Sequence, residues 1–281
     1  MSEKIENTRL SQLTLGKSTD YADSYAPELL QAVPRSFNRQ ELGLNDEQPF
    51  YGCDVWHAYE LSWLNDRGKP QVALARLIVP VESPNIVESK SLKLYFNSFN
   101  QTKISSQQSL EEMMLNDISQ TVGSPIKIEI ISPSANDFLK PVSLTGDCID
   151  DLDIDINDYS PNPELLKLEK ASQYVTESLH SHLLKSNCLI TNQPDWASVV
   201  IAYEGKQVDR ESLLRYLVAF RQHNEFHEHC VERIFMDILR QCQPKTLSVH
   251  AMYTRRGGID INPFRTTENE FEVPFSRVNR Q

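Results

Sequence analysis

Apolar residues follow two different periods along this chain, and they predict strands and helices in the same order twice. In the first half, residues 51–81 contain two β-rich runs separated by the turn-forming cluster NDRGKP, which predicts a hairpin. Two helices are expected next: one begins near Glu88, and one runs through SLEEMMLNDI, where four apolar residues have i, i+3, i+4, i+8 spacing. Residues 126–132, IKIEIIS, then alternate as a strand does.

The second half repeats this order, although few residue identities match. It contains a predicted hairpin (174–205), two predicted helices (210–222 and 225–242) and an alternating strand (246–254). Strands followed by helices predict α+β modules, in which two helices pack on one face of an antiparallel sheet. A Rossmann fold is not expected, because the chain has 9 glycines and no GxGxxG.

Four segments are expected along the chain. They are a polar N-terminal arm (1–50), a first module (51–135), an acidic linker (136–165) and a second module (166–281). The linker is predicted from the aspartates between Asp147 and Asp158 and the two prolines that follow. A calcium loop starting at Asp151 does not fit, because its sixth position would be Ile156 rather than glycine.

Composition limits the classes of partner. The formal charge of -11 opposes binding to a phosphate backbone, so no nucleic-acid partner is expected. No apolar run approaches the roughly 18 residues of a membrane helix, and the first residues lack the apolar core of a signal peptide, so we expect a cytoplasmic protein. The cysteines, Cys53, Cys148, Cys188, Cys230 and Cys242, form no CxxC pair, which predicts free thiols rather than a structural zinc site.

A cysteine and an aspartate lie close together in the second module. In KSNCLITNQPDW, residues 185–196, Cys188 precedes Asp195 in what is expected to be a long loop between two strands. A nucleophilic cysteine needs a base or a positive charge to form its thiolate, and Lys185 is near in sequence. An aspartate that donates a proton needs apolar surroundings, which Trp196 can supply. A buried, unreactive cysteine is the alternative that base rates favour.

HNEFHEHC, residues 223–230, is expected to open a helix with Asn224 as its N-cap. His227 and Glu228 then lie near the apolar stripe, as suits ligand contact, although a solvated first turn explains them equally well. A zinc site formed by the histidines of this stretch, His223, His227 and His229, lacks a convincing fourth ligand.

Two more stretches have chemistry that stays open on the residues alone. ESKSLKLYF, residues 88–96, has the pattern of a charged amphipathic helix start. TRRGGIDINPFR, residues 254–265, has adjacent arginines and a glycine pair after a strand, which suits either phosphate contact or a plain turn.

Together the four stretches resemble the NADPH-dependent nitrile reductases that convert 7-cyano-7-deazaguanine to 7-aminomethyl-7-deazaguanine in queuosine biosynthesis, in their two-module form. ESKSLKLYF resembles the signature helix of that family, KSNCLITNQPDW its nucleophile loop, FHEHC its substrate-binding helix and TRRGG its second cofactor contact. The resemblance spans residues 50–265. The first 50 residues and the acidic linker carry none of its motifs.

This resemblance implies a tunnelling fold, a homodimer and a requirement for both modules. It implies that Cys188 attacks the nitrile to form a covalent thioimide, that Asp195 donates a proton, and that two NADPH are consumed. No metal is implied. Substrate contacts are implied for Val87, Glu88, Ser89, His227 and Glu228, and NADPH contacts for Ser89, Lys90, Arg256 and Gly257.

Three rival functions remain open from the sequence. One is a zinc-dependent cyclohydrolase of the same fold that acts on a pterin or purine. Another is a non-catalytic purine-binding module in which Cys188 is merely buried. The third is a cysteine acyl-transfer enzyme that uses no nicotinamide.

Overall fold

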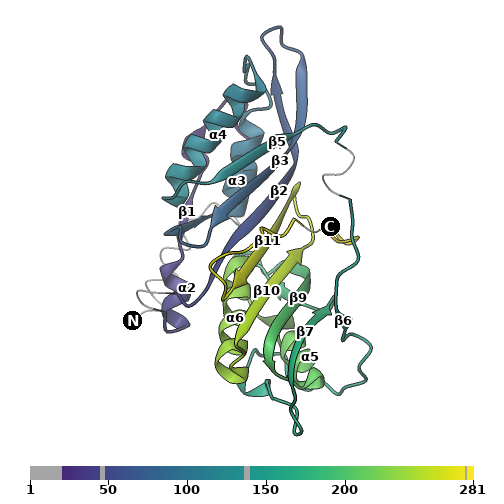
Figure 1. Ribbon diagram of the computed structural model, residues 1–281. Coiled ribbons are helices and arrows are strands. Elements are labelled where there is room, and N and C mark those ends of the chain that lie inside the picture. The colour runs from purple at the N-terminus through teal and green to yellow at the C-terminus, as the bar shows by residue number, and fades with distance from the viewer. Residues whose placement is uncertain (1–20, 45–47, 136–139, 276) are drawn as a thin grey trace. The chain divides into compact units, whose positions relative to one another are not determined.

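A computed structural model describes residues 21–44, 48–135, 140–275 and 277–281. The chain divides into two compact units, and neither is one contiguous stretch. Unit 1 comprises Met1–Asn45, Asp54–Lys140 and Arg255–Asp260, and unit 2 comprises Asp46–Cys53, Pro141–Thr254 and Ile261–Gln281. Each unit combines an antiparallel-rich sheet with two long helices, which confirms the predicted α+β class (Figure 1).

Unit 1 contains a sheet with the strand order β5-β3-β2. The predicted hairpin is formed by β2 (Tyr51–Leu64) and β3 (Pro70–Pro80), and β5 (Lys127–Ile131) pairs antiparallel with β3. The two predicted helices are α3 (Ser89–Ser98) and α4 (Gln107–Val122), which lie together beside this sheet (Figure 1). The strand–helix order read from the apolar periods is therefore confirmed in this unit.

Helix α4 shows how the sequence sets both its ends and its buried face. The Ser106 side chain accepts from the Ser109 N–H at the first turn, and Gly123 ends the helix with a left-handed φ of 74°. The apolar residues between these ends recur one turn apart and are fully buried: Leu110, Met114, Ile118 and Val122.

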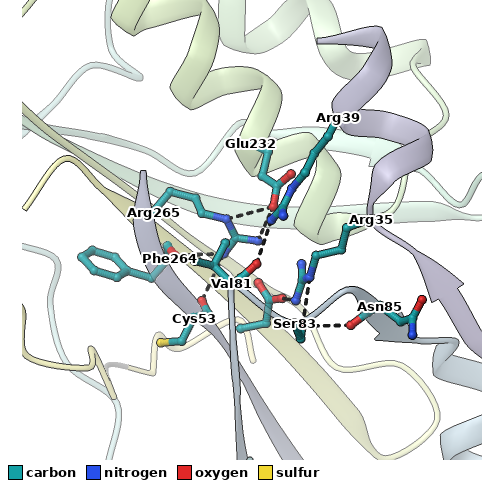
Figure 2. Close-up of polar contacts among 10 residues, drawn as sticks. Arg35, Arg39, Cys53, Val81, Ser83, Asn85, Glu232, Phe264 and Arg265 are labelled. Carbon is teal, nitrogen blue, oxygen red and sulfur yellow. Dashed lines mark hydrogen bonds and ion pairs between the residues drawn. The ribbon is translucent and has the colours of Figure 1, made fainter. Parts of the chain in front are cut away.

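Residues 21–44, which the sequence placed in an N-terminal arm, are an ordered part of unit 1. They form η1 (Pro27–Leu29), β1 (Ala32–Pro34) and α2 (Ser36–Glu41), and β1 pairs antiparallel with β4 (Asn85–Val87). The buried Arg35 donates to Asp54 at 2.6 Å and to the Ser83 hydroxyl at 3.1 Å (Figure 2). These elements have 3, 3 and 6 residues, too few for an apolar period to show, which is why the pattern missed them.

Unit 2 contains a sheet with the strand order β11-β10-β9-β7-β6, and β8 pairs with β9. Its strands are β6 (Asp147–Cys148), β7 (Tyr174–Ser181), β8 (Lys185–Asn187), β9 (Pro194–Lys206), β10 (Thr246–Tyr253) and β11 (Ile259–Thr266). Its helices are η2 (Pro163–Leu165), α5 (Arg210–Ala219), η3 (Phe220–Gln222) and α6 (His227–Cys242). Within this set only the β6–β7 pair is parallel.

An ion pair lies inside the core of unit 2. Arg265 on β11 donates to Glu232 on α6 at 3.0 Å, and both side chains are 0% exposed (Figure 2). Arg265 also donates to the carbonyl oxygen of Cys53 at 3.2 Å. A charge taken out of water needs such partners, so the position of β11 is tied to α6 by more than apolar contact.

The acidic segment expected to be a linker is attached to unit 2 from Pro141 onward. Asp150 accepts from the Ser181 hydroxyl at 2.6 Å and from the His182 N–H at 2.9 Å, and Ile149 is buried. Residues Arg255–Asp260, expected in the second module, belong instead to unit 1. Among the described residues, no helix has the length and apolarity needed to cross a bilayer.

Candidate functional site

The stretch around Cys188 is a short, closed hairpin rather than a long loop. Strand β8 pairs with β9 so that Ser186 lies opposite Asp195. The Cys188 N–H donates to the Gln193 carbonyl at 2.8 Å, and the Asn192 N–H donates back to the Cys188 carbonyl at 3.0 Å. The prediction that Asp195 lies in the loop is wrong, because main-chain pairing carries β9 back to Pro194 and places Asp195 on the strand.

Asn224 holds this hairpin from outside it. Its side-chain amide donates to the Cys188 carbonyl at 3.3 Å and to the Asn192 side chain at 3.0 Å. Helix α6 begins at His227 with Phe226 as the N-cap residue, so the prediction that Asn224 caps the helix is wrong. Asn224 lies before the helix, and its side-chain amide is bonded to the Cys188 hairpin instead of to the first turn of α6.

The register of β8 and β9 makes Cys188 and Asp195 neighbours. Cys188 directly follows β8, and its N–H is bonded to Gln193, two residues before Asp195, so Cys188 and Asp195 are diagonal neighbours across the hairpin. Diagonal neighbours of this kind are roughly 7–8 Å apart across an antiparallel pair. Asp195 is 3% exposed, whereas Cys188 is half-buried. The hairpin therefore brings a half-buried thiol and a buried acid near one another.

His227 lies against both Asp195 and an aromatic ring. Its Nε2 is 3.3 Å from Asp195 Oδ2, and its ring stacks on Tyr253 with centroids 3.9 Å apart and an interplanar angle of 9°. Tyr253 ends β10 and is fully buried, and burial followed by the nearby Cys230 raises its pKa well above the ordinary value. The imidazole is thus held edge-on to the carboxyl by a ring that stays neutral. No local pattern in the sequence indicated Tyr253.

Two carboxyl groups at the start of α6 have different environments. Burial acts to raise the pKa of Glu225, but hydrogen bonds from His223 and Arg233 outweigh it and keep that pKa below its ordinary value. Glu228 is 2% exposed and lies in the first turn of α6, where main-chain N–H groups favour a negative charge. Glu225 is therefore held by two side-chain partners, whereas Glu228 is buried in the first turn of α6.

The three histidines considered in the sequence as possible zinc ligands have separate partners. His223 pairs with Glu225 at 3.0 Å, His227 lies on Asp195 and Tyr253, and His229 is buried against Phe226. The cluster of possible metal ligands that the described residues do contain is elsewhere.

The signature stretch in unit 1 forms the entry to α3. Val87 ends β4, and Glu88 is the N-cap, whose carboxylate accepts from the Lys90 and Ser91 N–H groups at 2.8 Å each. Burial raises the pKa of Glu88, although the two N–H groups and the charges of Lys93 and Lys90 oppose that shift. Ser89 is half-buried at the first helical position.

The glycine pair forms a tight turn in the same unit. The Arg256 N–H donates to the Ile259 carbonyl at 2.9 Å, and Gly257 and Gly258 have φ of 57° and 74°, as a two-residue hairpin turn requires. A Cβ on Gly257 would lie 3.2 Å from the Lys93 side chain of α3. The turn therefore packs on the helix that carries Ser89 and Lys90.

This part of unit 1 has the donor set that a phosphorylated dinucleotide needs. Lys90, Lys93 and Arg256 are cationic, and Lys93 packs against Gly257, which brings α3 and the turn together. The Arg255 guanidinium lies 3.5 Å from the centroid of the Tyr59 ring. The predicted NADPH residues thus lie on two neighbouring elements and fit that cofactor.

Comparison with known proteins gives two family matches. Residues 21–130 match a model described as "Nitrile reductase, 7-cyano-7-deazaguanine-reductase N-term". Residues 194–272 match a model described as "QueF-like protein". The first range contains the entry to α3, and the second contains Asp195, His227, Glu228 and the Arg256–Gly257 turn.

One solved structure with a detectable likeness is the apo form of the archaeosine synthase QueF-Like. The sequences are 15% identical, the match covers 34% of this chain and 95% of that one, and the TM-score is 0.29. A likeness this low says nothing about the activity of this chain.

Proposed function

The chain belongs to the family of 7-cyano-7-deazaguanine nitrile reductases, and from this premise we propose that it reduces the nitrile of 7-cyano-7-deazaguanine to the primary amine of 7-aminomethyl-7-deazaguanine with two NADPH. The observation that carries the proposal is the buried Asp195, paired with His227 and diagonally across the hairpin from the half-buried Cys188. That set offers a nucleophile and a proton donor to one small group.

In the proposed first step, the Cys188 sulfur adds to the nitrile carbon and the nitrogen takes up a proton, which gives a thioimide bound to the chain. Asp195 would donate that proton; support comes from its burial, to 3% exposure, and from its position opposite Ser186, two residues before Cys188. The Asn224 bonds to the hairpin would hold the thiol at a fixed position during this addition.

NADPH, when bound, would supply the two hydrides that the carbon requires. Between them the carbon–sulfur bond must break, which returns the electron pair to the Cys188 sulfur and leaves an imine. His227 would exchange protons with Asp195 during these later stages, since its Nε2 is 3.3 Å from the carboxyl. The balance is two hydrides and two protons added to the carbon–nitrogen triple bond.

Binding roles follow the same proposal. Glu228 would accept from the ring N–H and exocyclic amine of the base, and Val87, Glu88 and Ser89 would also contact it. Ser89, Lys90, Arg256 and Gly257 would hold NADPH, with an arginine for its 2′-phosphate. The packing of the glycine turn on α3 supports this second assignment.

We further propose that the chain acts in the cytoplasm as a homodimer, on the free base rather than on a nucleic acid. The formal charge of -11 supports the exclusion of a polyanion. Sedimentation equilibrium would show twice the chain mass, and a monomer at micromolar concentration would contradict the dimer.

The decisive experiment measures NADPH oxidation by the purified chain. Absorbance should fall only when 7-cyano-7-deazaguanine is present, and Cys188→Ala should abolish turnover without changing the unfolding midpoint. Turnover that survives in this variant would remove the covalent mechanism. A cyclohydrolase of the same fold would instead require a metal and would resist thiol alkylation, and an acyl-transfer enzyme would leave NADPH unchanged.

A further inference from the structure

We propose that Cys148, His180 and His182 form a zinc-binding site in unit 2. These residues come from β6, β7 and the residue just after β7, and none of them has a role in the proposed reduction. Thiolate and imidazole are the ligands that Zn²⁺ prefers, whereas Mg²⁺ and Ca²⁺ prefer oxygen. The site is independent of the proposed function.

The strand pairing brings the three side chains together. Cys148 lies directly opposite His180 in the parallel β6–β7 pair, and the Ile149 N–H donates to the His180 carbonyl at 3.0 Å. One ligand atom from each residue lies within 4.8 Å of the others. Around a tetrahedral zinc these atoms would be about 3.5 Å apart, as its usual bond lengths require. Side-chain rotation must therefore bring the atoms closer, and Cys148 is exposed rather than packed in the core.

Both imidazoles already have the outer partner that metal-binding histidines use. His180 Nδ1 lies 3.2 Å from the Thr145 carbonyl oxygen, and His182 Nδ1 lies 2.8 Å from the Ser198 hydroxyl. When Nδ1 carries the proton in such a bond, the lone pair is on Nε2 and the ring is held in place. The two rings are 5.5 Å apart at 71°, so they do not stack and can converge on one ion.

A zinc ion here would fasten the acidic segment to the sheet. Strand β6 has only two residues, and Arg210 is a further tie, since it bridges Asp147 and Glu177 at 2.8 Å each. Three protein ligands leave a fourth position for water. The site would therefore cross-link Cys148 to β7 and stabilise the folded segment that begins at Pro141.

The test uses metal-free full-length protein, titrated calorimetrically with Zn²⁺ alone. We expect one ion per chain. Cys148→Ser removes a direct ligand, so it should weaken zinc affinity by more than about 100-fold, the largest loss usual for removing a hydrogen-bond partner of a ligand. Ser198→Ala removes the partner of His182, so it should weaken binding by about 10-fold. Zinc should raise the unfolding midpoint of the wild type but not that of Cys148→Ser.

Cobalt identifies the thiol that binds. Co²⁺ coordinated by a thiolate gives a near-ultraviolet charge-transfer band, which should vanish in Cys148→Ser and persist in Cys188→Ser, the matched control at the other cysteine that is not buried. Loss of the band in the control but not in Cys148→Ser would move the metal to the Cys188 hairpin and overturn the proposal. Absence of zinc binding in the wild type would overturn it as well, and neither outcome depends on NADPH turnover.

Discussion

Asp195 combines deep burial with a histidine 3.3 Å away, so its carboxyl is shielded from water and has a side chain with which it can exchange a proton. Asp195→Asn keeps the shape but removes the exchangeable acid. We expect turnover to fall by about 10²- to 10⁴-fold, the usual contribution of a positioned acid, while calorimetry shows base affinity within a few-fold of the wild type.

The control for this variant is Asp237→Asn, which alters another buried aspartate of unit 2, one that accepts from Tyr216 at 2.6 Å. It should retain turnover. An Asp195→Asn protein that loses base binding and turnover equally would have a structural defect rather than a missing proton donor.

Glu228 and Glu225 lie three residues apart, and we expect substitution of the first to lower base affinity and substitution of the second to lower stability. Glu228→Gln should weaken the affinity for 7-cyano-7-deazaguanine by at least about 10-fold, the value of one lost charge-assisted bond. Glu225→Gln should instead lower the free energy of unfolding by about 2–3 kcal/mol, because Arg233 and His223 lose their partner. Calorimetry and urea unfolding separate the two effects, and unchanged base affinity in Glu228→Gln would remove that residue from the site.

The resemblance of four sequence stretches to a known family selected Cys188, Asp195, His227 and Glu228 as candidates, but the sequence did not show what holds them. The stack of His227 on Tyr253 depends on where β10 ends relative to α6, which no local spacing encodes. Asn224 looked like a helix cap because capping and loop bonding use the same amide. Its real contacts are to residues more than thirty positions away.

At the scale of elements, the Cys188 hairpin is held by the Asn224 side chain as well as by its own backbone. Asn224→Ala removes its bonds to Cys188 and Asn192 and the bond that it accepts from the Asn187 side chain, so the thiol should lose its fixed position and turnover should fall by about 10- to 100-fold. Asn192→Gly is the matched variant, since it keeps the φ of 55° accessible and removes only the bond between the two side chains. It should lose less activity than Asn224→Ala, and equal loss would assign the effect to that one bond.

The glycine turn after β10 should be intolerant of a side chain for two separable reasons. The comparison is Gly68, in the turn between β2 and β3. Gly68→Ala, at φ of +80° with nothing within 4 Å of the new Cβ, should lower the free energy of unfolding by about 1–2 kcal/mol from backbone strain alone. Gly258→Ala, at φ of +74°, should cost more, because its Cβ would lie 2.5 Å from Glu60 Cδ. Urea unfolding of the two variants measures the difference, and equal costs would show that Glu60 moves aside freely.

Long periodic elements were predictable from the sequence, and short or interrupted ones were not. Helix α3 was expected near Glu88 and begins at Ser89, because its apolar face and its acidic N-cap indicate the same starting point. Strand β8 has three residues, too few for an alternation to show. Strand β11 contains Pro263, which argues against a strand in any pattern, yet it pairs with β10 over Ser248–His250.

At the scale of the whole molecule, buried thiols limit stability at high pH. Burial raises the pKa of Cys242 to about 11, and burial together with Glu225 raises the pKa of Cys230 to about 12, from an ordinary 9.0. Above about pH 9 the unfolded chain loses these protons and the folded chain keeps them. The free energy of unfolding should therefore fall as pH rises, by up to about 1.4 kcal/mol per unit for each thiol.

Urea unfolding under reducing conditions between about pH 9 and 11 measures this slope. Cys242→Ala should make it shallower, because one of the two groups no longer titrates. Buried tyrosines add to the slope in both proteins, so the comparison is made at matched pH. A slope that is identical in the variant would mean that Cys242 titrates alike in the folded and unfolded states.

Each unit includes a segment that lies, in sequence, within the other half of the chain, and this limits where the gene can be divided in two. A product that ends at Lys140 would lack Arg255–Asp260, and its complement would lack Asp46–Cys53, including Gly52, where a side chain would overlap the Phe264 carbonyl. Each half-gene would thus encode a piece of the other unit. Expressed separately, the halves should be trapped by chaperones or degraded, and only co-expression should yield material that survives purification.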